Sequence, residues 1–276
     1  MRFWIKIIVF VGSCAAALGA GSAAAGWMRG ADGLPAGIVL LSERPLAAVV
    51  AVITAFGASV LLGLFAGRVA GPRAGLFIAG VSVLGFAART GGATSVLRSR
   101  GESWQLLVEA GAWSFLILLA SRILLARNNR APRIPTDGGT TFMHRYGWLL
   151  GCAAVLPVVW MLARSELKGQ TIAAACIASI AAGLIGQVLV HRERAVMFAA
   201  IPLVGGIGAI VATFLGGPLN PAQIPQGWSP FLLVMPQDYA AGAMVGGLVG
   251  ILWADTILHE NPSRSEPEAP VQPPRL

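Results

Sequence analysis

Three histidines carry the most versatile chemistry in this sequence, and each falls near the end of a long apolar segment. They are His144, His191 and His259, and Glu193 lies two residues after His191. Imidazole and carboxylate groups together bind transition metals and transfer protons. No two histidines are four residues apart, as zinc-binding helices require, and none belongs to an HExxH motif. His191, His259 and Glu193 are therefore candidates for a metal or acid–base site, with ordinary polar residues at helix ends as the competing interpretation.

Other cofactor chemistry has no support in the sequence. The three cysteines, Cys14, Cys152 and Cys176, lie in apolar segments at spacings that fit no metal or redox motif. No glycine-rich phosphate loop stands beside a βαβ pattern. The basic residues lie in connections and at the ends of apolar segments, which favours contact with lipid headgroups over nucleic acid. We expect no cofactor and no nucleic-acid partner.

Glu109 is the acidic residue that most needs an explanation. It lies about one helical turn inside an apolar segment, and an ionisable group at that depth in a membrane is costly and marks a functional candidate. Arg89 ends the preceding apolar segment at a similar height. The sequence predicts an ion pair between Arg89 and Glu109. The alternative is that Glu109 binds a solute or transfers a proton.

Proline and glycine mark two further kinds of position. Pro157 predicts a kink, and Pro202 with Gly206 lies in a glycine-rich segment where a broken helix could line a transport path. Gly242, Gly246 and Gly250 recur every four residues, a spacing that lets two membrane helices approach closely. We expect these three glycines to lie at a helix contact.

Composition places these residues in a membrane protein. Of 276 residues, 56% are hydrophobic and only 12% are charged, whereas soluble domains carry roughly 25% charged residues. The apolar runs are continuous and about as long as a helix that crosses the hydrocarbon layer. The sequence predicts an all-α, polytopic transmembrane bundle of about eight spans, at residues 7–25, 46–67, 74–88, 106–126, 146–163, 171–190, 195–215 and 238–258.

The segment between residues 122 and 145 sets the expected orientation, because it carries five arginines and one acid. Basic connections stay on the cytoplasmic side, so both termini are expected inside, and the connections 27–44 and 90–105 outside. We expect the first span to be retained in the mature protein. The alternative is that it is a cleaved signal peptide, which would leave seven spans. Many arginines and alanines favour a bacterium, and thus its cytoplasmic, or inner, membrane.

The basic segment also divides the chain. We expect a first membrane half at 1–126, a basic cytoplasmic loop at 127–144, a second membrane half at 145–258 and a disordered, proline-rich cytoplasmic tail at 259–276. Each half would hold about four spans.

Three functions remain open at this level. The leading one is a non-catalytic assembly or scaffold component, whose partners would be the lipid bilayer and other membrane helices or further copies of the chain. The second is a small-solute permease that uses spans five to eight. The third is a membrane enzyme with a cytoplasmic histidine and carboxylate site, so enzymatic activity is left uncertain, with the balance against it.

Overall fold

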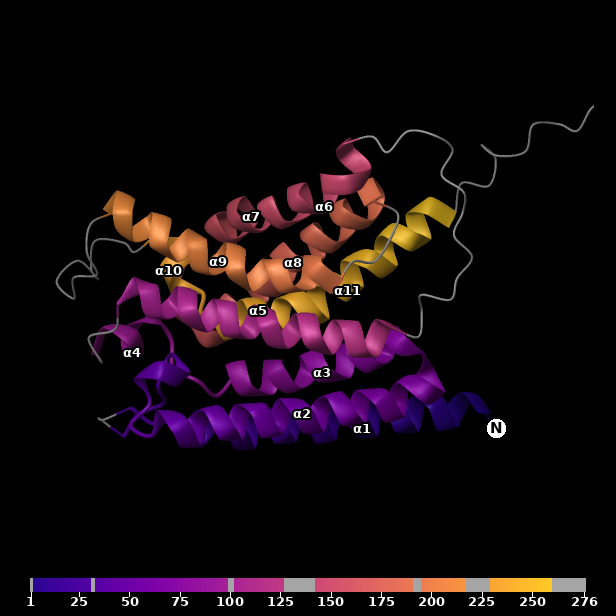
Figure 1. The fold of residues 1–276 in the computed structure, drawn as a ribbon, viewed down its shortest axis with the longest axis horizontal. Helices are drawn as coiled ribbons and strands as arrows, with labels where there is room; N and C mark the ends of the chain where they lie inside the picture. Colours follow the sequence, from indigo (N-terminus) through magenta and orange to yellow (C-terminus); the bar gives the residue numbers. More distant parts are fainter. Residues whose placement is uncertain are drawn as a thin grey trace, which may run out of the picture.

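The computed structural model describes residues 2–30, 33–98, 102–126, 142–190, 195–216 and 229–259. Long helices run side by side along the longest axis of the molecule (Figure 1). No β-strand occurs in these ranges, where the one extended pairing is an isolated bridge between Arg29 and Pro35. The predicted all-α class is confirmed.

The first three long helices form one side of the bundle. They are α1 (Arg2–Ala25), α2 (Pro45–Ala70) and α3 (Pro72–Ala87). Gly71 joins α2 to α3 at a φ of 103°, a conformation that glycine adopts without a steric penalty. Beyond this turn Gly63 and Gly75 bring the two backbones together, since a Cβ on either glycine would collide with the other residue's carbonyl oxygen. This turn lies at one end of the long helices, which we call the hairpin end.

The opposite end carries short elements packed across the tips of the long helices. Residues 33–42, which we call the strap, include a short 3-10 helix, η1 (Val39–Leu41), and precede α2. Helix α4 (Ala93–Arg98) lies beside the strap and leads toward α5 (Ser103–Leu125). The connections expected to be plain polar loops are therefore partly helical and partly buried. We call this side the strap end.

The remaining helices form the other side. They are α6 (Phe142–Ala153), α7 (Val155–Leu162), α8 (Lys168–Val190), α9 (Ala195–Gly216), the short α10 (Pro230–Leu233) and α11 (Pro236–His259). The interruption between α6 and α7 falls at Ala154, as the kink predicted from Pro157 requires, because a proline clashes with the carbonyl group four residues earlier.

Pro202 lies inside α9 without interrupting it. The helix runs from Ala195 through Pro202 to Gly216, so the break that the sequence made possible at Pro202 is not found. The glycines that follow are used for packing: Gly205 lies against the ring of Tyr239, and Gly206 lies against Ala110 of α5. A proline is tolerated inside a membrane helix when neighbouring groups satisfy the backbone that it leaves free.

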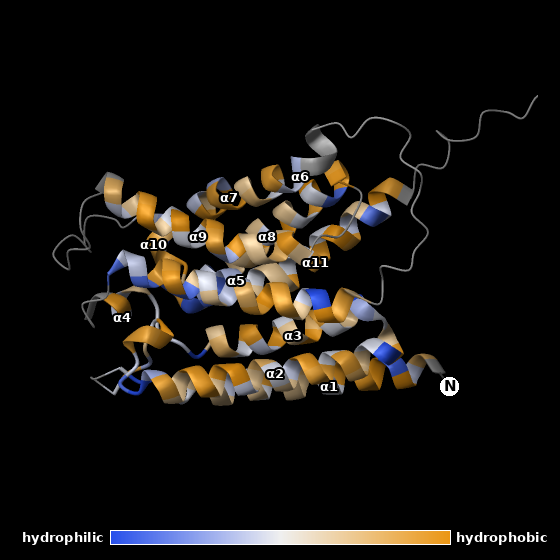
Figure 2. Cartoon of the chain, viewed as in Figure 1, coloured by the Kyte–Doolittle hydropathy of each residue, from blue (hydrophilic) through white to orange (hydrophobic). Residues whose placement is uncertain are grey.

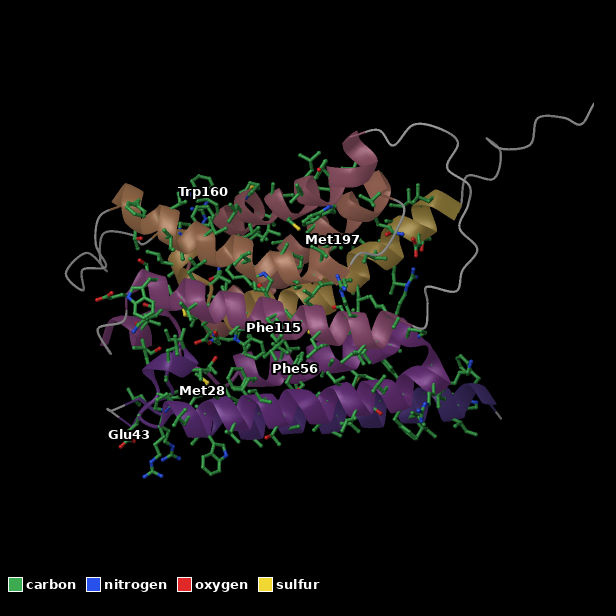
Figure 3. All side chains as sticks on the ribbon, viewed as in Figure 1. Met28, Glu43, Phe56, Phe115, Trp160 and Met197 are labelled. Carbon is green, nitrogen blue, oxygen red and sulfur yellow. The ribbon has the colours of Figure 1, made fainter. Side chains whose placement is uncertain are left out.

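Helix α11 lies between the two sides and joins them. It packs against α8 on one side and α3 on the other, and one hydrophobic core contains residues from both segments predicted as membrane halves. Side chains fill the space between the ribbons: Phe56 and Phe86 pack against Trp113, and Met197 lies in the second group of helices (Figure 3).

The protein is a multi-pass membrane protein. Six helices in the described ranges are long and apolar enough to cross a membrane, namely α1, α2, α5, α8, α9 and α11, and the hydropathy colours of Figure 2 show that most of their residues are hydrophobic. The other two apolar segments, Pro72–Ala87 and Tyr146–Leu162, form shorter helices. The predicted count of about eight spans is therefore supported for six.

The three evenly spaced glycines of α11 lie against α8. A Cβ on Gly242 would come within 2.6 Å of the carbonyl oxygen of Ala175, and Cβ atoms on Gly246 and Gly250 would collide with the carbonyl oxygens of Cys176 and Ile180. Glycine is the residue that lets two helix backbones approach so closely.

We expect Gly246→Ala to lower the free energy of unfolding by about 1–3 kcal/mol, because the added methyl group meets backbone atoms that cannot rotate away. Gly57→Ala is the matched control, since nothing lies within 4 Å of that position. Thermal unfolding of both variants in one mild detergent measures the difference. Equal melting temperatures for the two would contradict the packing described here.

Candidate functional site

Three consecutive polar residues begin α11 and are all buried. Gln237 and Asp238 are 0% exposed and Tyr239 is 1% exposed. Successive residues on a helix point about 100° apart, so the three side chains reach different neighbours. Tyr239 packs its ring on Gly205 of α9, while the other two form polar contacts with other parts of the bundle. At the strap end, the first turn of α11 thus contacts several other segments of the bundle.

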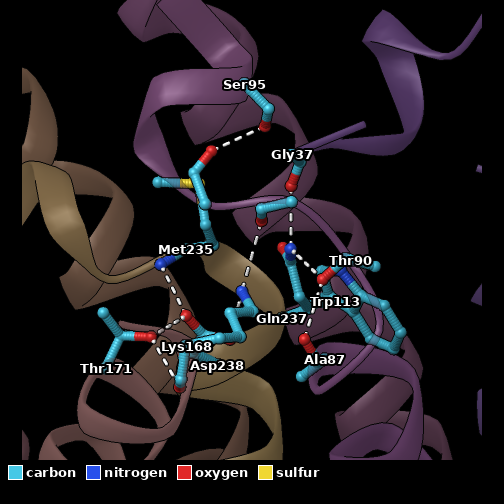
Figure 4. A network of polar contacts seen from close by, with 12 residues as sticks. Gly37, Ala87, Thr90, Ser95, Trp113, Lys168, Thr171, Met235, Gln237 and Asp238 are labelled. Carbon is cyan, nitrogen blue, oxygen red and sulfur yellow. Dashed lines mark hydrogen bonds and ion pairs between the residues drawn. The ribbon is translucent and has the colours of Figure 1, made fainter. Parts of the chain in front are cut away.

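Asp238 binds α8 through a buried ion pair. Its Oδ1 lies 2.8 Å from Nζ of Lys168, and its Oδ2 accepts hydrogen bonds from the Thr171 hydroxyl at 3.0 Å and the Met235 backbone N–H at 3.1 Å (Figure 4). The bond to Met235 also caps the first turn of α11, where a negative charge is favoured by the helix dipole. One carboxylate therefore fixes both the start of α11 and its distance from α8.

Gln237 binds in the opposite direction, toward α3 and the strap. Its Nε2 donates to the carbonyl oxygen of Gly37 at 2.7 Å and to Oγ1 of Thr90 at 3.0 Å (Figure 4). The Thr90 hydroxyl in turn donates a hydrogen bond to the carbonyl oxygen of Ala87, the last residue of α3. These bonds connect three segments that are far apart in the sequence.

Glu109 supports the strap from α5. The side chain is buried, and its Oε2 accepts the backbone N–H of Val39 at 2.6 Å, while Oε1 lies 3.4 Å from Nε1 of Trp113. Arg89 is exposed and makes no ion pair with Glu109, although both residues are described. The predicted Arg89–Glu109 pair is wrong, because a backbone amide of the strap occupies the carboxylate instead.

A second polar cluster lies at the hairpin end of α11. Asp255 is 2.7 Å from the guanidinium group of Arg73 at the start of α3 and accepts a hydrogen bond from Nε2 of Gln187 on α8 at 2.8 Å. Seventeen residues separate Asp238 from Asp255, which is about 26 Å along a helix. The hydrocarbon layer is about 30 Å thick, so the two carboxylates mark the two edges of the apolar part of α11.

The histidine site predicted from the sequence cannot be placed. His191 and Glu193 lie outside the described residues, and the same holds for the side chain of His259, the last residue of α11. Within the described ranges no group of three His, Cys, Asp or Glu side chains lies together. The polar layer at the strap end is built from one ammonium group, two carboxylates, an amide and hydroxyls, a set suited to holding helices in register.

The interior around this layer is tightly filled. Two small cavities stand out in the described part of the chain. The first lies between α1, α2, α3 and α5 and has a volume of about 10 Å³. That is room for about one water molecule. The second, beside Gly205 and Tyr239, is smaller still.

Sequence reasoning missed the residues that make this layer. The sequence places Lys168 in the outer turn before the sixth span and Asp238 at the start of the eighth span, on the same side of the membrane, but gives no reason to pair them, and it does not single out Gln237 or Thr171. A signal was present, since each of the four opens an apolar segment rather than lying far outside it. Only the packing of α8 against α11 shows which of them meet.

We expect Lys168→Met to destabilise the protein by about 3 kcal/mol, because Asp238 keeps its charge in a buried position without a cation. The double variant Lys168→Met with Asp238→Asn should recover more than half of that loss, since asparagine still accepts from Thr171 and Met235. Lys6→Met, at an exposed position of α1, is the control. Thermal unfolding gives the coupling energy, and additive effects would exclude a direct pair.

Comparisons with family models, with curated proteins and with solved structures found no match for this chain. Its class follows from its own helices, six of which have the length and apolar composition of membrane spans.

Proposed function

We propose that the protein is a non-catalytic component of a membrane assembly, and that the outward face of α1 binds another transmembrane helix. The observation that carries this proposal is the position of two glycines. Gly12 and Gly19 lie on α1 where an added Cβ would meet no atom within 4 Å in the described part of the chain. They are seven residues apart, which puts them on the same face of the helix.

The glycines inside the bundle make a contrast. Gly75, Gly183 and Gly246 each allow a close backbone contact with a neighbouring helix, so the cost of a glycine is offset by packing. In a helix, glycine is less favourable than alanine by about 1 kcal/mol. At Gly12 and Gly19 no close contact with the described residues offsets that cost, and Ala15, Ala16 and Ala23 extend the same face of small, exposed residues.

A partner helix would offset the cost in the way that α8 does for α11. Small residues let two helix backbones approach in lipid, where van der Waals contact takes the place of the hydrophobic effect. Helix α1 is also the least covered of the six candidate spans, since only 11% of its most apolar 18-residue stretch is buried within the protein. This degree of exposure fits a helix at the edge of the chain's own bundle and inside a larger assembly.

The proposal includes an orientation. The orientation rests on the sequence, in which 13 of the 20 basic residues fall in segments expected inside, among them Lys6, Arg68, Arg73 and Arg122 at the hairpin end; the strap end also carries basic residues, namely Arg29, Arg44, Arg89, Arg98, Arg164 and Lys168. By the positive-inside rule this end faces the cytoplasm and the strap end faces outward. We further propose that the membrane is the cytoplasmic membrane of a bacterium.

We expect extracts of the native membrane in mild detergent to contain the protein in a particle larger than the monomer. Gly12→Leu combined with Gly19→Leu should reduce the particle to monomer size, because two bulky side chains hold a partner backbone away. Ala173→Leu, at an exposed position of α8, is the matched control and should leave the particle intact. A parent protein that migrates as a monomer would refute the proposal.

A small-solute permease is the second candidate, and the interrupted helix pair α6 and α7 favours it. Broken helices line the binding sites of many transporters, and ion pairs at both ends of α11, Lys168–Asp238 and Arg73–Asp255, would then close the two sides. The hollows next to these helices are too small for a solute in the conformation described.

Swelling of protein-loaded liposomes in small neutral solutes separates the two candidates. If the protein is an assembly component, liposomes that contain it should swell no faster than liposomes without protein. A permease should accelerate swelling for at least one solute and lose that effect in Lys168→Met.

A further inference from the structure

Four basic residues lie at similar heights at the hairpin end. Lys6 of α1 and Arg73 of α3 each precede a phenylalanine by about one helical turn, and the rings of those phenylalanines, Phe10 and Phe77, are 5.8 Å apart. Because α1 and α3 run in the same direction (Figure 1), Lys6 and Arg73 reach similar heights in the bundle.

Arg68 and Arg122 lie near the ends of their helices at this height. Arg68 is in the last turn of α2, just before the turn at Gly71. Arg122 is in the last turn of α5, close to Leu124, whose side chain lies beside Gly75 of α3. With a rise of 1.5 Å per residue, the four basic residues fall within about 10 Å along the bundle axis.

Exposed tryptophans mark the same height. Trp4 comes shortly before Lys6, and Trp253 comes shortly before Asp255, the partner of Arg73. Their exposed fractions are 67% and 57%. Tryptophan is enriched where the hydrocarbon layer meets the lipid headgroups. The basic residues therefore lie at the level of the headgroups.

The charge at the hairpin end is not balanced among the described side chains. Asp255 is the acidic side chain described there, and it binds Arg73. Lys6, Arg68 and Arg122 are exposed and form no ion pair with a described residue. At the strap end the described basic and acidic side chains are equal in number, namely Arg29, Arg44, Arg89, Arg164 and Lys168 against Glu43, Glu102, Glu109, Glu166 and Asp238. Arg98 of α4 adds one positive charge at the strap end, and Arg2 of α1 adds one at the hairpin end.

Two of the three unpaired basic residues lie on lipid-facing sides of their helices. Arg68 follows Leu61 by about two turns, and Arg122 follows Phe115 by about two turns, so each pair shares one helix face. Leu61 is 67% exposed and Phe115 is 66% exposed. The apolar stems of the arginines therefore continue faces that lie against acyl chains, while their charged ends reach the headgroups.

We propose that the hairpin end binds the phosphate groups of anionic phospholipids through Lys6, Arg68 and Arg122. Such a phosphate supplies the negative charge that no described side chain places beside these residues. Each basic residue near an anionic membrane surface strengthens the attraction by roughly fivefold. A lipid fits better than a soluble phosphate ester, because Arg68 and Arg122 extend from faces that contact the hydrocarbon layer. The proposal is independent of a partner helix on α1, since Gly12 and Gly19 lie on a different face from Lys6.

Lipid retention tests this site. The full chain is incubated in mild detergent with equal amounts of phosphatidylglycerol and phosphatidylcholine and is then separated from free lipid, and the bound lipids are counted by mass spectrometry. We expect the parent to retain at least about fivefold more phosphatidylglycerol than phosphatidylcholine. Lys6→Gln combined with Arg68→Gln and Arg122→Gln should retain the two lipids equally, because glutamine keeps a polar side chain without the charge.

The matched control removes three exposed positive charges at the strap end, in Arg29→Gln combined with Arg44→Gln and Arg89→Gln. This variant has the same net charge as the hairpin-end variant and should keep the preference for phosphatidylglycerol. The proposal is overturned by a parent without the preference, by a hairpin-end variant that keeps it, or by equal loss in both variants.

Two further measurements use the parent alone. Sodium chloride at about 0.5 M should remove most of the preference, because it screens exposed charges. An excess of glycerol phosphate should leave the bound phosphatidylglycerol in place. A preference that salt does not change would overturn the proposal, and so would release by glycerol phosphate, which would assign the site to soluble phosphate esters.

Discussion

The close approach of α8 and α11 is the contact on which the rest of this bundle depends. Gly242, Gly246 and Gly250 let the two backbones meet, and only at that separation do the carboxylates of α11 reach the polar side chains of α8. Asp238 then meets Lys168 and Thr171, and Asp255 meets Gln187. In lipid, van der Waals contact has to supply much of the attraction between helices, so the glycine seam and the polar contacts at its ends act together.

The polar residues of the chain are placed where their cost is lowest and their effect greatest. Asp238 and Asp255 lie about as far apart as the hydrocarbon layer is thick, so each binds near an edge of that layer. A buried ion pair is weak support for stability against an apolar pair, but breaking it is costly. The Lys168–Asp238 pair therefore specifies which helices meet, and at what height, more than it adds free energy. Gln237 and Glu109 extend the same principle to the strap.

Glycines on the surface of the bundle differ from those in its interior in what they contact. Gly183 of α8 and Gly242, Gly246 and Gly250 of α11 are matched by close backbone contacts, whereas Gly12 and Gly19 of α1 are not. The same residue type thus has opposite environments in two helices of one chain. A second helix against α1 would make the two cases alike, which is the physical basis of our proposal that the protein belongs to a membrane assembly.

Hydrophobic run length by itself determined the all-helical class and the approximate position of each apolar helix, because a chain in lipid must satisfy its backbone within helices. Pro157 likewise predicted the interruption between α6 and α7. Pro202 does not interrupt α9, and Arg89 does not pair with Glu109, whose carboxylate accepts the amide of Val39 instead. Which polar groups meet was decided by tertiary structure alone: Lys168 and Asp238 are 70 residues apart, and their pairing depends on a helix contact that composition and spacing do not encode.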